Sequence, residues 1–515
     1  MRIIDSADIT EAVVRRMGET ETSHVYNGLD CCVTFEIMEN LEAELRDEPQ
    51  CVRDTYADSL AKLGPFTEMS LRGLRVDSIR KSDALRAFQQ DLDRLQSIWD
   101  QYCEAAFDNT LNWASPKQMQ TLFYDYLQIN PIKGRNSKGA YVPTTNEDAL
   151  LKLADTFYGG PFARLVLAMR SIQKSMGFLK SQVDPDGRFR CQLNVCGTNT
   201  GRASSEMSNF ETGSNLQNVD TRLRDAFVAD PGYILVNVDL EQADARNVGA
   251  ILWTIFRDVY GDADAGRYLD FCESGDLHTG VTSMIWPELP WPQTDRLSDP
   301  KLWKKVAAAL YVKDKSYRDV AKGAGHGSNY MGQPRTISKQ TGVPVEPVAA
   351  FQAKYFQQFP LIPAWHKWTI EQIKTLGFLT TLYGRRRFFF GRGDDASVHR
   401  AAVAYSPQSM TGHEMDMGII NLFRRKPEAQ LLIQVHDSIL FQVPIADHER
   451  HVEESLRHLE FRFDLAGGRE FTVPLEAKTG YNWGYYNETR NPFGLRDWRG
   501  HDEREQPKSG LASLF

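Results

Sequence analysis

Two aspartates, far apart in the sequence, each stand where an apolar strand is predicted to end. Asp239 follows the β-branched run "GYILVNV" and precedes a stretch of helical periodicity, while Asp437 lies in the middle of "LLIQVHDSILFQV". The second segment predicts a hairpin that turns at His436-Asp437, because polar and apolar residues alternate along both arms. An unpaired carboxylate in so apolar a hairpin costs several kcal/mol. Both positions therefore require a compensating positive charge.

Divalent cations would supply that charge. Mg²⁺ prefers a few carboxylate oxygens together with substrate phosphates. Two such ions can hold the attacking and leaving oxygens of an in-line phosphoryl transfer. We therefore expect Asp239 and Asp437 to hold two Mg²⁺ ions, for which Mn²⁺ can substitute. The alternative, on this segment alone, is that Asp437 only closes a β-turn.

A predicted helix carries a row of side chains that suit phosphate. The stretch "YRDVAKGAGHGSNY" places four residues at intervals of four, on one slowly drifting helix face: Arg318, Lys322, His326 and Tyr330. Two permanent cations one turn apart suit a triphosphate, because Arg binds phosphate through a planar fork and Lys as a point charge. The three glycines in this stretch each cost about 1 kcal/mol relative to alanine, which indicates that a flat group such as a base pair approaches closely. An ordinary exposed charged helix is the alternative, and it does not explain the glycines.

These residues must be positioned by a small number of predicted elements. A long amphipathic helix is expected over 76–107 and a second helical stretch over 145–181. A turn followed by alternation predicts a strand entering a sheet within 184–195. The strand at 232–240, followed directly by a helix, and the hairpin at 431–443 then place the two aspartates at strand ends.

Composition sets the class of protein. The chain has 515 residues, of which 42% are hydrophobic, and a net charge of −8, which argues weakly against a nucleic-acid partner. Basic runs at 301–305, 384–392 and 423–427 qualify that reading, although each alone is explained by a solvated face. Seven cysteines without a C-x-x-C pair indicate neither a zinc site nor a disulfide framework. With no signal-peptide pattern and no long apolar run, a cytoplasmic protein without a membrane partner is expected.

Together these motifs resemble those of family A DNA polymerases, the group of bacterial DNA polymerase I and many phage replicative polymerases. "VDLEQADAR", "RDVAKGAGHGSNYMG" and "QVHDS" are similar to the family's motifs A, B and C. "TGRASS", "NLQN", "GDLHT", "TLYGRRR" and "RAAVAYSPQ" also match, in the family's order. The resemblance covers residues 65–485.

The resemblance implies an α+β right-hand fold with an antiparallel palm sheet, helical fingers and a helical thumb. The expected divisions are an exonuclease-domain remnant (1–50), a linker (51–77), thumb (78–190), palm (191–250 and 396–490), fingers (251–395) and a polar, flexible C-terminal tail (491–515).

The resemblance also implies an activity, namely the addition of deoxynucleotides from deoxynucleoside triphosphates to the 3′ end of a primer-template DNA. Asp239, Asp437 and the Leu240 carbonyl would be the metal ligands. Lys322 would also protonate the pyrophosphate leaving group. The incoming nucleotide would be contacted by Arg318, Lys322, His278, His326, Tyr330, Asp244 and Gln242. The primer-template would be contacted by Arg202, Asn215, Gln217, Arg400, Gln408, Gln434 and His436.

Three positions depart from the family's pattern. Asp244, which would reject a ribose 2′-hydroxyl beside Tyr330, stands where the family has glutamate, so we expect a looser sugar gate or one repositioned by neighbours. His326 replaces an aromatic residue that helps to discriminate the sugar 3′ position. Ser438 replaces the glutamate that commonly follows the motif C aspartate, which implies that this carboxylate is dispensable here.

The two ends of the chain carry further expectations. "YNGLDCCVTFEI" resembles the last motif of a proofreading 3′–5′ exonuclease, with Tyr26 and Asp30. One carboxylate cannot hold two metals, so we expect no intrinsic proofreading and either a separate exonuclease subunit or a degenerate domain. The final "LASLF" resembles the peptides that polymerases insert into sliding clamps.

Two alternatives remain at this point. A single-subunit RNA polymerase-like enzyme shares the two aspartates and a similar cationic helix, although "TGRASS" and the acid at 244 favour deoxynucleotides. A catalytically inactive DNA-binding remnant is the other, and the intact pair of aspartates argues against it. If the chain is phage-encoded, its compartment is the cytoplasm of a bacterial host.

Overall fold

A central antiparallel sheet holds both aspartate-bearing segments. The computed structural model describes residues 10–136, 139–312, 315–391 and 394–498. The sheet has five strands in the order β13-β14-β8-β17-β18, all antiparallel. Its strands are β8 (Tyr233–Leu240), β13 (Gln430–Val435), β14 (Ser438–Pro444), β17 (Leu475–Gly480) and β18 (Arg496–Asp497). The predicted hairpin and the antiparallel palm sheet are confirmed.

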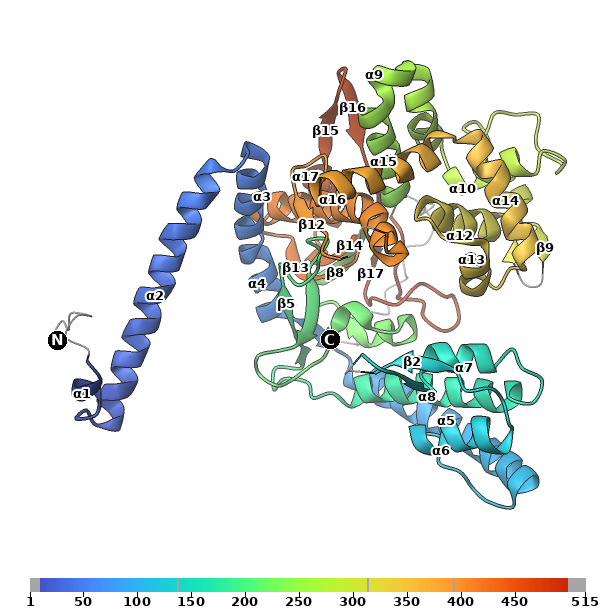
Figure 1. The fold of residues 1–515 in the computed structure, drawn as a ribbon, viewed down its shortest axis with the longest axis horizontal. Coiled ribbons are helices and arrows are strands. Elements are labelled where there is room, and N and C mark those ends of the chain that lie inside the picture. The colour runs from blue at the N-terminus through green and yellow to red at the C-terminus, as the bar shows by residue number, and fades with distance from the viewer. Residues whose placement is uncertain (1–9, 137–138, 313–314, 392–393, 499–515) are drawn as a thin grey trace.

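Long helices cover this sheet (Figure 1). They are α9 (Ala243–Glu273), α16 (Ala396–Arg425) and α17 (His448–Leu459). α16 packs against both α9 and α17, and α16 and α17 also contact β14. β8 reads as a buried strand because its apolar residues meet neighbours on both faces, with Val236 and Val238 fully buried. The start of α9 follows β8 directly, so the residues after Asp239 are fixed relative to the sheet.

A second group of helices lies beside the sheet, between α9 and α16 in the sequence. It consists of α10 (Leu277–Ile285), α11 (Pro300–Ala307), α12 (Tyr317–Asn329), α13 (Pro334–Thr341), α14 (Val345–Gln358) and α15 (Leu361–Leu376), with the short hairpins β9 (Leu310–Val312)–β10 (Lys315–Ser316) and β11 (Phe378–Thr380)–β12 (Arg386–Phe388). α12 begins with a capping box in which Ser316 and Asp319 satisfy each other's backbone N–H. The predicted helix is confirmed for Arg318, Lys322 and His326. Tyr330 follows its last residue as the C-cap.

A third, helical unit has a hydrophobic core of its own (Figure 1). α5 (Ser78–Phe107) packs against α8 (Gly160–Lys180). α6 (Pro116–Gln120), the π-helix η2 (Thr121–Tyr126), α7 (Glu147–Leu153) and the hairpin β2 (Lys133–Arg135)–β3 (Tyr141–Pro143) complete it. The stretch expected to be helical over 145–181 is two helices, because Pro161 in the first turn of α8 starts a new helix.

Small sheets connect these units. β1 (Leu74–Val76) pairs with β4 (Arg188–Phe189) and β7 (Phe227–Val228), and β5 (Cys191–Asn194) pairs with β6 (Ser204–Met207). The prediction of one strand in 184–195 was therefore wrong. The alternating pattern there belongs to two short strands with different partners, neither in the central sheet. Two short 3-10 helices, η3 (Leu216–Asn218) and η4 (Thr221–Ala226), and the hairpin β15 (Arg462–Leu465)–β16 (Arg469–Thr472) complete this part of the fold.

Within residues 10–72 the amino-terminal segment consists of helices joined by short turns. It comprises α1 (Glu11–Val14), α2 (Glu19–Asp47), α3 (Gln50–Ala61) and α4 (Leu63–Arg72). α2 projects away from the rest of the molecule and contains no buried residue (Figure 1). Tyr26 and Asp30 both lie on this exposed helix.

The expected flexible tail is partly structured, which corrects one predicted boundary. Within 491–498, β18 pairs with β17, Leu495 is buried and the Trp498 N–H donates to the Ala477 carbonyl. The polar composition of this stretch concealed two apolar residues that pack at the edge of the sheet. The "LASLF" end lies outside the described residues. In the part of the chain that the structure describes, no helix combines the length and apolarity that a bilayer span requires.

Candidate active site

The two aspartates meet at one end of the central sheet. Ser438, the residue after Asp437, is the cross-strand partner of Asp239. The Leu240 N–H donates to the Asp437 carbonyl at 3.1 Å. His436, at the hairpin tip, adopts a left-handed backbone with φ of 56°, which closes the tight turn and places Asp437 beside β8. The structure therefore brings Asp239, Leu240 and Asp437 together.

The electrostatic surroundings of Asp239 favour a cation. Burial raises the pKa of Asp239 to about 7, and the negative charges of Asp437 and Glu476 add to the shift. Glu476 is the partner of Asp239 on the other neighbouring strand, β17, so it projects from the same face of the sheet. Its carboxylate pairs with Lys478 at 2.9 Å. Sequence reasoning missed Glu476, because only the strand register shows that it lies opposite Asp239.

The donor set at this place is small and made of oxygen. Among the described residues, no group of three or more His, Cys, Asp or Glu side chains has the geometry to hold a metal by itself. A pair of carboxylates with a backbone carbonyl suits Mg²⁺, which usually keeps several waters and completes its shell with substrate phosphates. The unfavourable like charge at Asp239 is the observation that fits such an ion, because a bound cation would remove it.

Arg318 on α12 is bound to a carboxylate rather than free. Its Nε and Nη2 donate to the two oxygens of Asp276 at 2.8 and 2.9 Å. Asp276 is also the N-cap of α10, accepting from the Thr279 N–H. Although burial alone would raise the pKa of Asp276, hydrogen bonds from Arg318 and Thr279 hold it well below its usual range. Sequence reasoning missed this partner, although "GDLHT" contains an Asp-x-x-Thr capping pattern.

His278 lies next to these cations as a neutral side chain. Burial lowers its pKa to about 4, and the positive charges of Arg318 and Lys322 lower it further against the opposing effect of Asp276. At neutral pH the imidazole can therefore donate a hydrogen bond but adds no charge. Lys322, one turn after Arg318, is exposed.

A small cavity of about 30 Å³ joins several of the predicted nucleotide-binding residues. Its lining comes from α9, α10, α12 and α14 and includes Asp244, His278, His326 and Tyr330. The rings of His326 and Tyr330 meet edge to face, with centroids 4.8 Å apart. A volume of this size admits about one water and not a nucleoside, so these side chains are in near contact around a closed space. Gln242 ties two of the helices together, since its Oε1 accepts from the Leu277 N–H at 3.0 Å.

Asp244 is held by two side chains, those of Thr411 and Arg202. Its Oδ1 accepts from the Thr411 hydroxyl at 2.7 Å and from Arg202 Nη2 at 3.3 Å. The Tyr330 hydroxyl is buried and has no hydrogen-bond partner among the described residues. Burial, followed by the negative charge of Asp244, raises the pKa of Tyr330 well above its usual value. The short side chain at 244 is therefore positioned by neighbours on α16 and by Arg202.

Most of the predicted primer-template contacts belong to two hydrogen-bonded sets, which we call together the primer-template group. Gln217 Nε2 donates to Gln434 Oε1 at 3.1 Å, and Gln434 in turn donates to the His436 carbonyl. Arg202 Nε donates to the Gln408 carbonyl at 2.9 Å, and Gly412 leaves room for the Arg202 side chain. Two further predicted contacts lie outside this group. Asn215 uses its side-chain oxygen to cap η3 and to accept from Ser205, and Arg400 lies exposed on α16 about two turns before Gln408.

Arg224 is a further cation that sequence reasoning did not identify. Its guanidinium lies over the Trp483 ring, 4.6 Å from the centroid, and its Nε has no hydrogen-bond partner among the described residues. Burial lowers the pKa of Arg224, while Asp239 is near enough to raise it slightly. A half-buried arginine near Asp239 therefore adds positive charge at this end of the sheet. No short sequence signal distinguishes it from other arginines.

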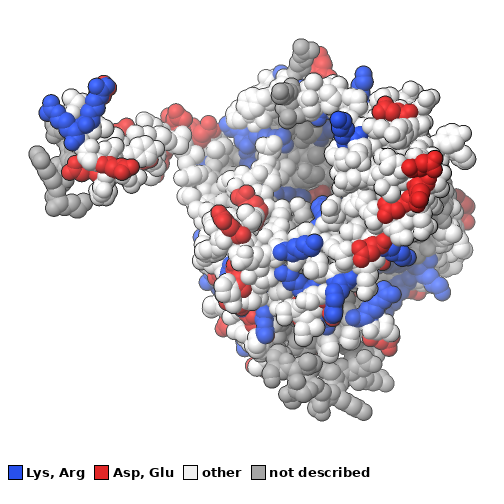
Figure 2. Space-filling model, turned by 90° about the horizontal axis from the view of Figure 1, so that it is seen from below, with Lys and Arg blue, Asp and Glu red and all other residues white. Residues whose placement is uncertain are grey.

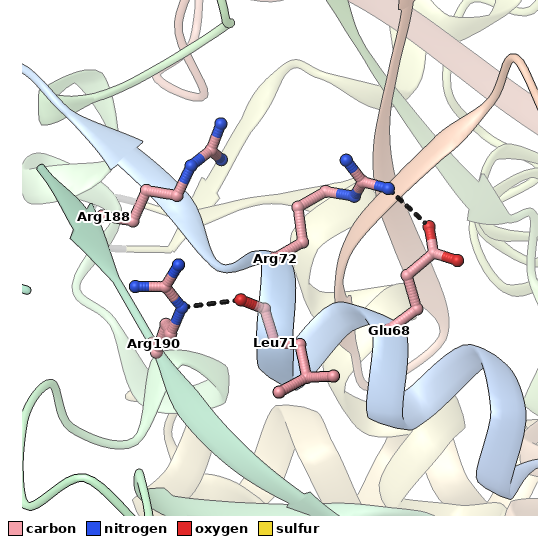
Figure 3. Close-up of a pocket in the computed structure, with 5 residues that line it drawn as sticks. All are labelled: Glu68, Leu71, Arg72, Arg188 and Arg190. Atoms are coloured by element: carbon pink, nitrogen blue, oxygen red, sulfur yellow. Dashed lines mark hydrogen bonds and ion pairs between the residues drawn. The ribbon is translucent and has the colours of Figure 1, made fainter. Parts of the chain in front are cut away.

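A larger cavity elsewhere does not offer an anion site. It has a volume of about 530 Å³ and is lined by Glu68, Leu71, Arg72, Arg188 and Arg190 (Figure 3). Each arginine already has a carboxylate partner: Glu68 for Arg72, Asp230 for Arg188, and Asp184 and Asp186 for Arg190. The positive charge there is balanced within the protein. On the face shown in Figure 2, Lys and Arg likewise occur in separate groups between Asp and Glu.

Sequence comparison identifies relatives over most of the chain. The model of the family described as DNA polymerase family A matches residues 82–252 and 301–485. "DNA polymerase I, thermostable" of Thermus filiformis is 27% identical over 434 residues, which cover 81% of this chain and 46% of the relative. DNA polymerase I of Mycobacterium tuberculosis is 28% identical over 444 residues, 82% of this chain and 44% of the relative. The chain thus spans about half the length of these relatives.

A solved structure has the same fold. The polymerase domain of Pol1 from M. smegmatis, in complex with DNA primer-template and dNTP, aligns over 82% of this chain and 70% of its own length with a TM-score of 0.64 and 23% identity. This similarity, with the mixed helix and sheet architecture, confirms the right-hand polymerase fold. Since the family model matches well over half of the sequence, the chain belongs to DNA polymerase family A.

Proposed function

We propose that this chain is a template-directed DNA polymerase that adds deoxynucleotides to a primer 3′ end by two-metal-ion phosphoryl transfer. The observation that carries the proposal is the meeting of Asp239 and Asp437 at the end of the central sheet, where burial and then the negative charge of Asp437 raise the pKa of Asp239. Family membership supports the same reaction. The names of the relatives, and the primer-template DNA and dNTP in the mycobacterial structure, support the substrates.

Asp239, Asp437 and the Leu240 carbonyl would hold two divalent ions, Mg²⁺ or in its place Mn²⁺. When bound, such ions stabilise the charge that develops on the attacking and leaving oxygens. The protein's own part is to keep the two carboxylates adjacent before any ligand arrives. It does so through the backbone hydrogen bond from Leu240 to Asp437 and through the β8–β14 pairing.

The triphosphate would lie along α12. Lys322 is exposed and one turn from Arg318, so it can bind phosphate and give a proton to the departing pyrophosphate. Arg318 would exchange the Asp276 carboxylate for phosphate oxygens, which accept the same two N–H groups. His278 would donate a hydrogen bond as a neutral imidazole.

The nucleoside would occupy the space between α9 and α12. Because the present cavity is too small for it, α12 has to move relative to α9, as helical fingers do in closing. His326 and Tyr330 would then face the base and sugar, with Asp244 at the ribose 2′ position and Gln242 holding α9 to α10.

The primer-template would lie against the primer-template group, with Asn215 and Arg400 beside it. That group contains Arg202, Gln217, Gln408, Gln434 and His436. Donors of this kind can read the acceptors that every base pair presents in the minor groove. In this proposal the thumb is formed by residues 78–190 and the fingers by residues 251–395. The palm is formed by residues 191–250 together with residues 396–490.

Proofreading is not part of the proposed activity. Tyr26 and Asp30 lie on α2, and within residues 10–72 no strand accompanies that helix. A single carboxylate on an exposed helix cannot hold two metals, so residues 10–72 would not form an exonuclease site. A sliding clamp bound by the C-terminal end, and a cytoplasmic site of action, complete the proposal.

A primer-extension assay tests the reaction and the proofreading together. A matched primer-template with the four dNTPs and Mg²⁺ should be extended, and Asp437→Ala should abolish extension. A primer with a mismatched 3′ end should be neither shortened nor efficiently extended. Extension with ribonucleotides in preference to deoxynucleotides would favour the RNA polymerase alternative. DNA binding without any extension would favour the inactive remnant.

A further inference from the structure

A chain of buried polar side chains lies behind Asp244 and connects it to a distant loop. The Thr411 hydroxyl donates to Asp244 at 2.7 Å, and Asn247 Nδ2 donates to the Thr411 oxygen at 3.1 Å. Asn247 Nδ2 also donates to Glu414 at 3.2 Å. The far oxygen of Glu414 accepts from the Tyr383 hydroxyl at 2.8 Å, and Tyr383 lies in the turn between β11 and β12.

The order of donors determines which way Thr411 points. A hydroxyl has one proton, and here its oxygen already accepts from Asn247, so its own proton is available to an acceptor. The Asp244 carboxylate at 2.7 Å is nearer than the other candidate, the Pro407 carbonyl at 3.0 Å, and it carries charge. Asn247 thus sets the Thr411 hydroxyl to donate to Asp244.

This network is inaccessible to water and is built on two rigid helices. Asn247, Thr411 and Glu414 are each 0% exposed. Asn247 comes from α9, as Asp244 does, and the other two come from α16. Asn247 Oδ1 has no hydrogen-bond partner among the described residues, but its Nδ2 donates to both Thr411 and Glu414, and such buried hydrogen bonds hold the side chains in one arrangement. The carboxylate of Asp244 is therefore fixed to the helices that cover the central sheet.

Among the described residues, no hydrogen bond within the usual distance joins the same carboxylate to α12, although Asp244 lies near enough to Tyr330 to raise the pKa of its hydroxyl after the larger effect of burial. Tyr330, which follows that helix, keeps its buried hydroxyl without a partner among the described residues. If α12 moves when a nucleotide binds, the position of Asp244 does not have to follow it.

We propose that Thr411 is a positioning residue that holds the Asp244 carboxylate where it excludes a ribose 2′-hydroxyl, with Asn247 orienting the Thr411 hydroxyl. This inference rests on the proposed polymerase function. It makes selection against ribonucleotides depend on a threonine of α16 that would not touch the substrate.

Thr411→Val tests the proposal, because valine has nearly the same shape and lacks the hydroxyl. Single-nucleotide incorporation would be measured with dNTP and rNTP on the same primer-template. We expect the ratio of kcat/KM for dNTP to that for rNTP to fall about tenfold, which corresponds to one hydrogen bond to a charged group. The change should come mainly from a lower KM for rNTP, since a freed Asp244 obstructs the 2′-hydroxyl less.

Two control variants separate positioning from folding. Thr411→Ser keeps the hydroxyl and should retain most of the selectivity. Thr369→Val makes the same substitution at a buried threonine of α15 whose hydroxyl has no hydrogen-bond partner among the described residues, and it should leave the ratio unchanged. A purely structural role of Thr411 would reduce the use of both nucleotides alike.

An unchanged ratio in a folded Thr411→Val protein that extends primers with dNTPs would overturn the inference and leave the polymerase assignment intact. If Thr411→Val does not fold, Asn247→Ala decides: a smaller fall in the ratio supports the proposal and an unchanged ratio overturns it. Failure of the wild-type protein to incorporate dNTPs would instead overturn the proposed function.

Discussion

Arg318 and Asp276 form a two-point ion pair, with Nε to Oδ2 at 2.8 Å and Nη2 to Oδ1 at 2.9 Å. The two N–H groups that a phosphate would need are thus occupied by a carboxylate of α10. A nucleotide that binds Arg318 must first displace Asp276, and that exchange reduces the net gain from each phosphate contact.

Replacement of Asp276 by asparagine should tighten nucleotide binding. Asparagine still caps α10 but competes weakly for the guanidinium, so we expect the KM for dNTP in steady-state extension to fall by about threefold to tenfold. As a control, Asp319→Asn changes an acidic capping residue of α12 and leaves the hydrogen bonds from the Arg318 guanidinium to Asp276 in place. An unchanged or higher KM for Asp276→Asn would show that Asp276 orients Arg318 for phosphate.

The same pair predicts a loss of stability in acid. The folded-state pKa of Asp276 is held below its usual value, chiefly by hydrogen bonds from Arg318 and Thr279 that outweigh the effect of burial. Its contribution to the free energy of unfolding is therefore complete above the ordinary carboxyl pKa and is lost as pH falls through the folded-state pKa. Urea unfolding of wild type and Asp276→Asn should give free energies that differ by a constant amount at pH 6 and above, and the difference should shrink progressively below about pH 4.

Asp239 predicts the opposite dependence on pH. Its folded-state pKa is raised to about 7, first by burial and then by Asp437 and Glu476, so without metal the folded form loses stability as pH rises from about 4 through 7. Asp239→Asn should therefore increase Tm at pH 8 in EDTA, with a smaller effect at pH 4, and should abolish extension. Mg²⁺ should raise the Tm of the wild type and leave that of the variant nearly unchanged.

A lower Tm of Asp239→Asn at pH 8 would contradict this prediction, because the carboxylate would then be stabilised by an interaction other than metal binding. Asp464→Asn is a suitable control, since it neutralises an aspartate of the β15–β16 hairpin.

A buried ion pair joins the amino-terminal helices to α16. Lys62 Nζ lies 2.8 Å from Asp416 Oδ2, with the two side chains 2% and 8% exposed, and it also donates to the Val195 and Gly201 carbonyls. Lys62→Met leaves a buried carboxylate unpaired, so we expect a loss of about 3–5 kcal/mol in the free energy of unfolding. Lys62→Met combined with Asp416→Leu should recover most of that loss in urea titrations. A double variant as unstable as the single one would contradict this explanation.

Local sequence patterns were sufficient for the elements that carry the aspartates. β8 and the β13–β14 hairpin follow from apolar runs that end at Asp239 and turn at His436, and α12 follows from its residues at intervals of four. These features depend on neighbours within a few residues. The relation of Asp239 to Asp437 also needed the motifs' resemblance to a family, because no local rule pairs β8 with β14.

The contacts that the sequence did not predict all depend on long-range register or packing. Glu476 lies opposite Asp239 only because β17 pairs with β8 in that register. Asp276 reaches Arg318 across two helices, and Thr411 reaches Asp244 across two others. The strand expected in 184–195 was divided between two sheets because its partners, β1 and β6, lie outside any local window. The domain boundaries other than the start of the tail stay predictions.

The α5–α8 unit contains a smaller hydrophobic cluster, although Phe88 of α5 and Met176 of α8 belong to the larger one. Trp99, Phe123, Leu150 and Val166 are packed with one another apart from the larger cluster around the central sheet. On warming, the smaller cluster should melt first, as a distinct calorimetric transition. That transition would leave the β8–β14 pairing intact, because the buried apolar residues of both strands belong to the larger cluster.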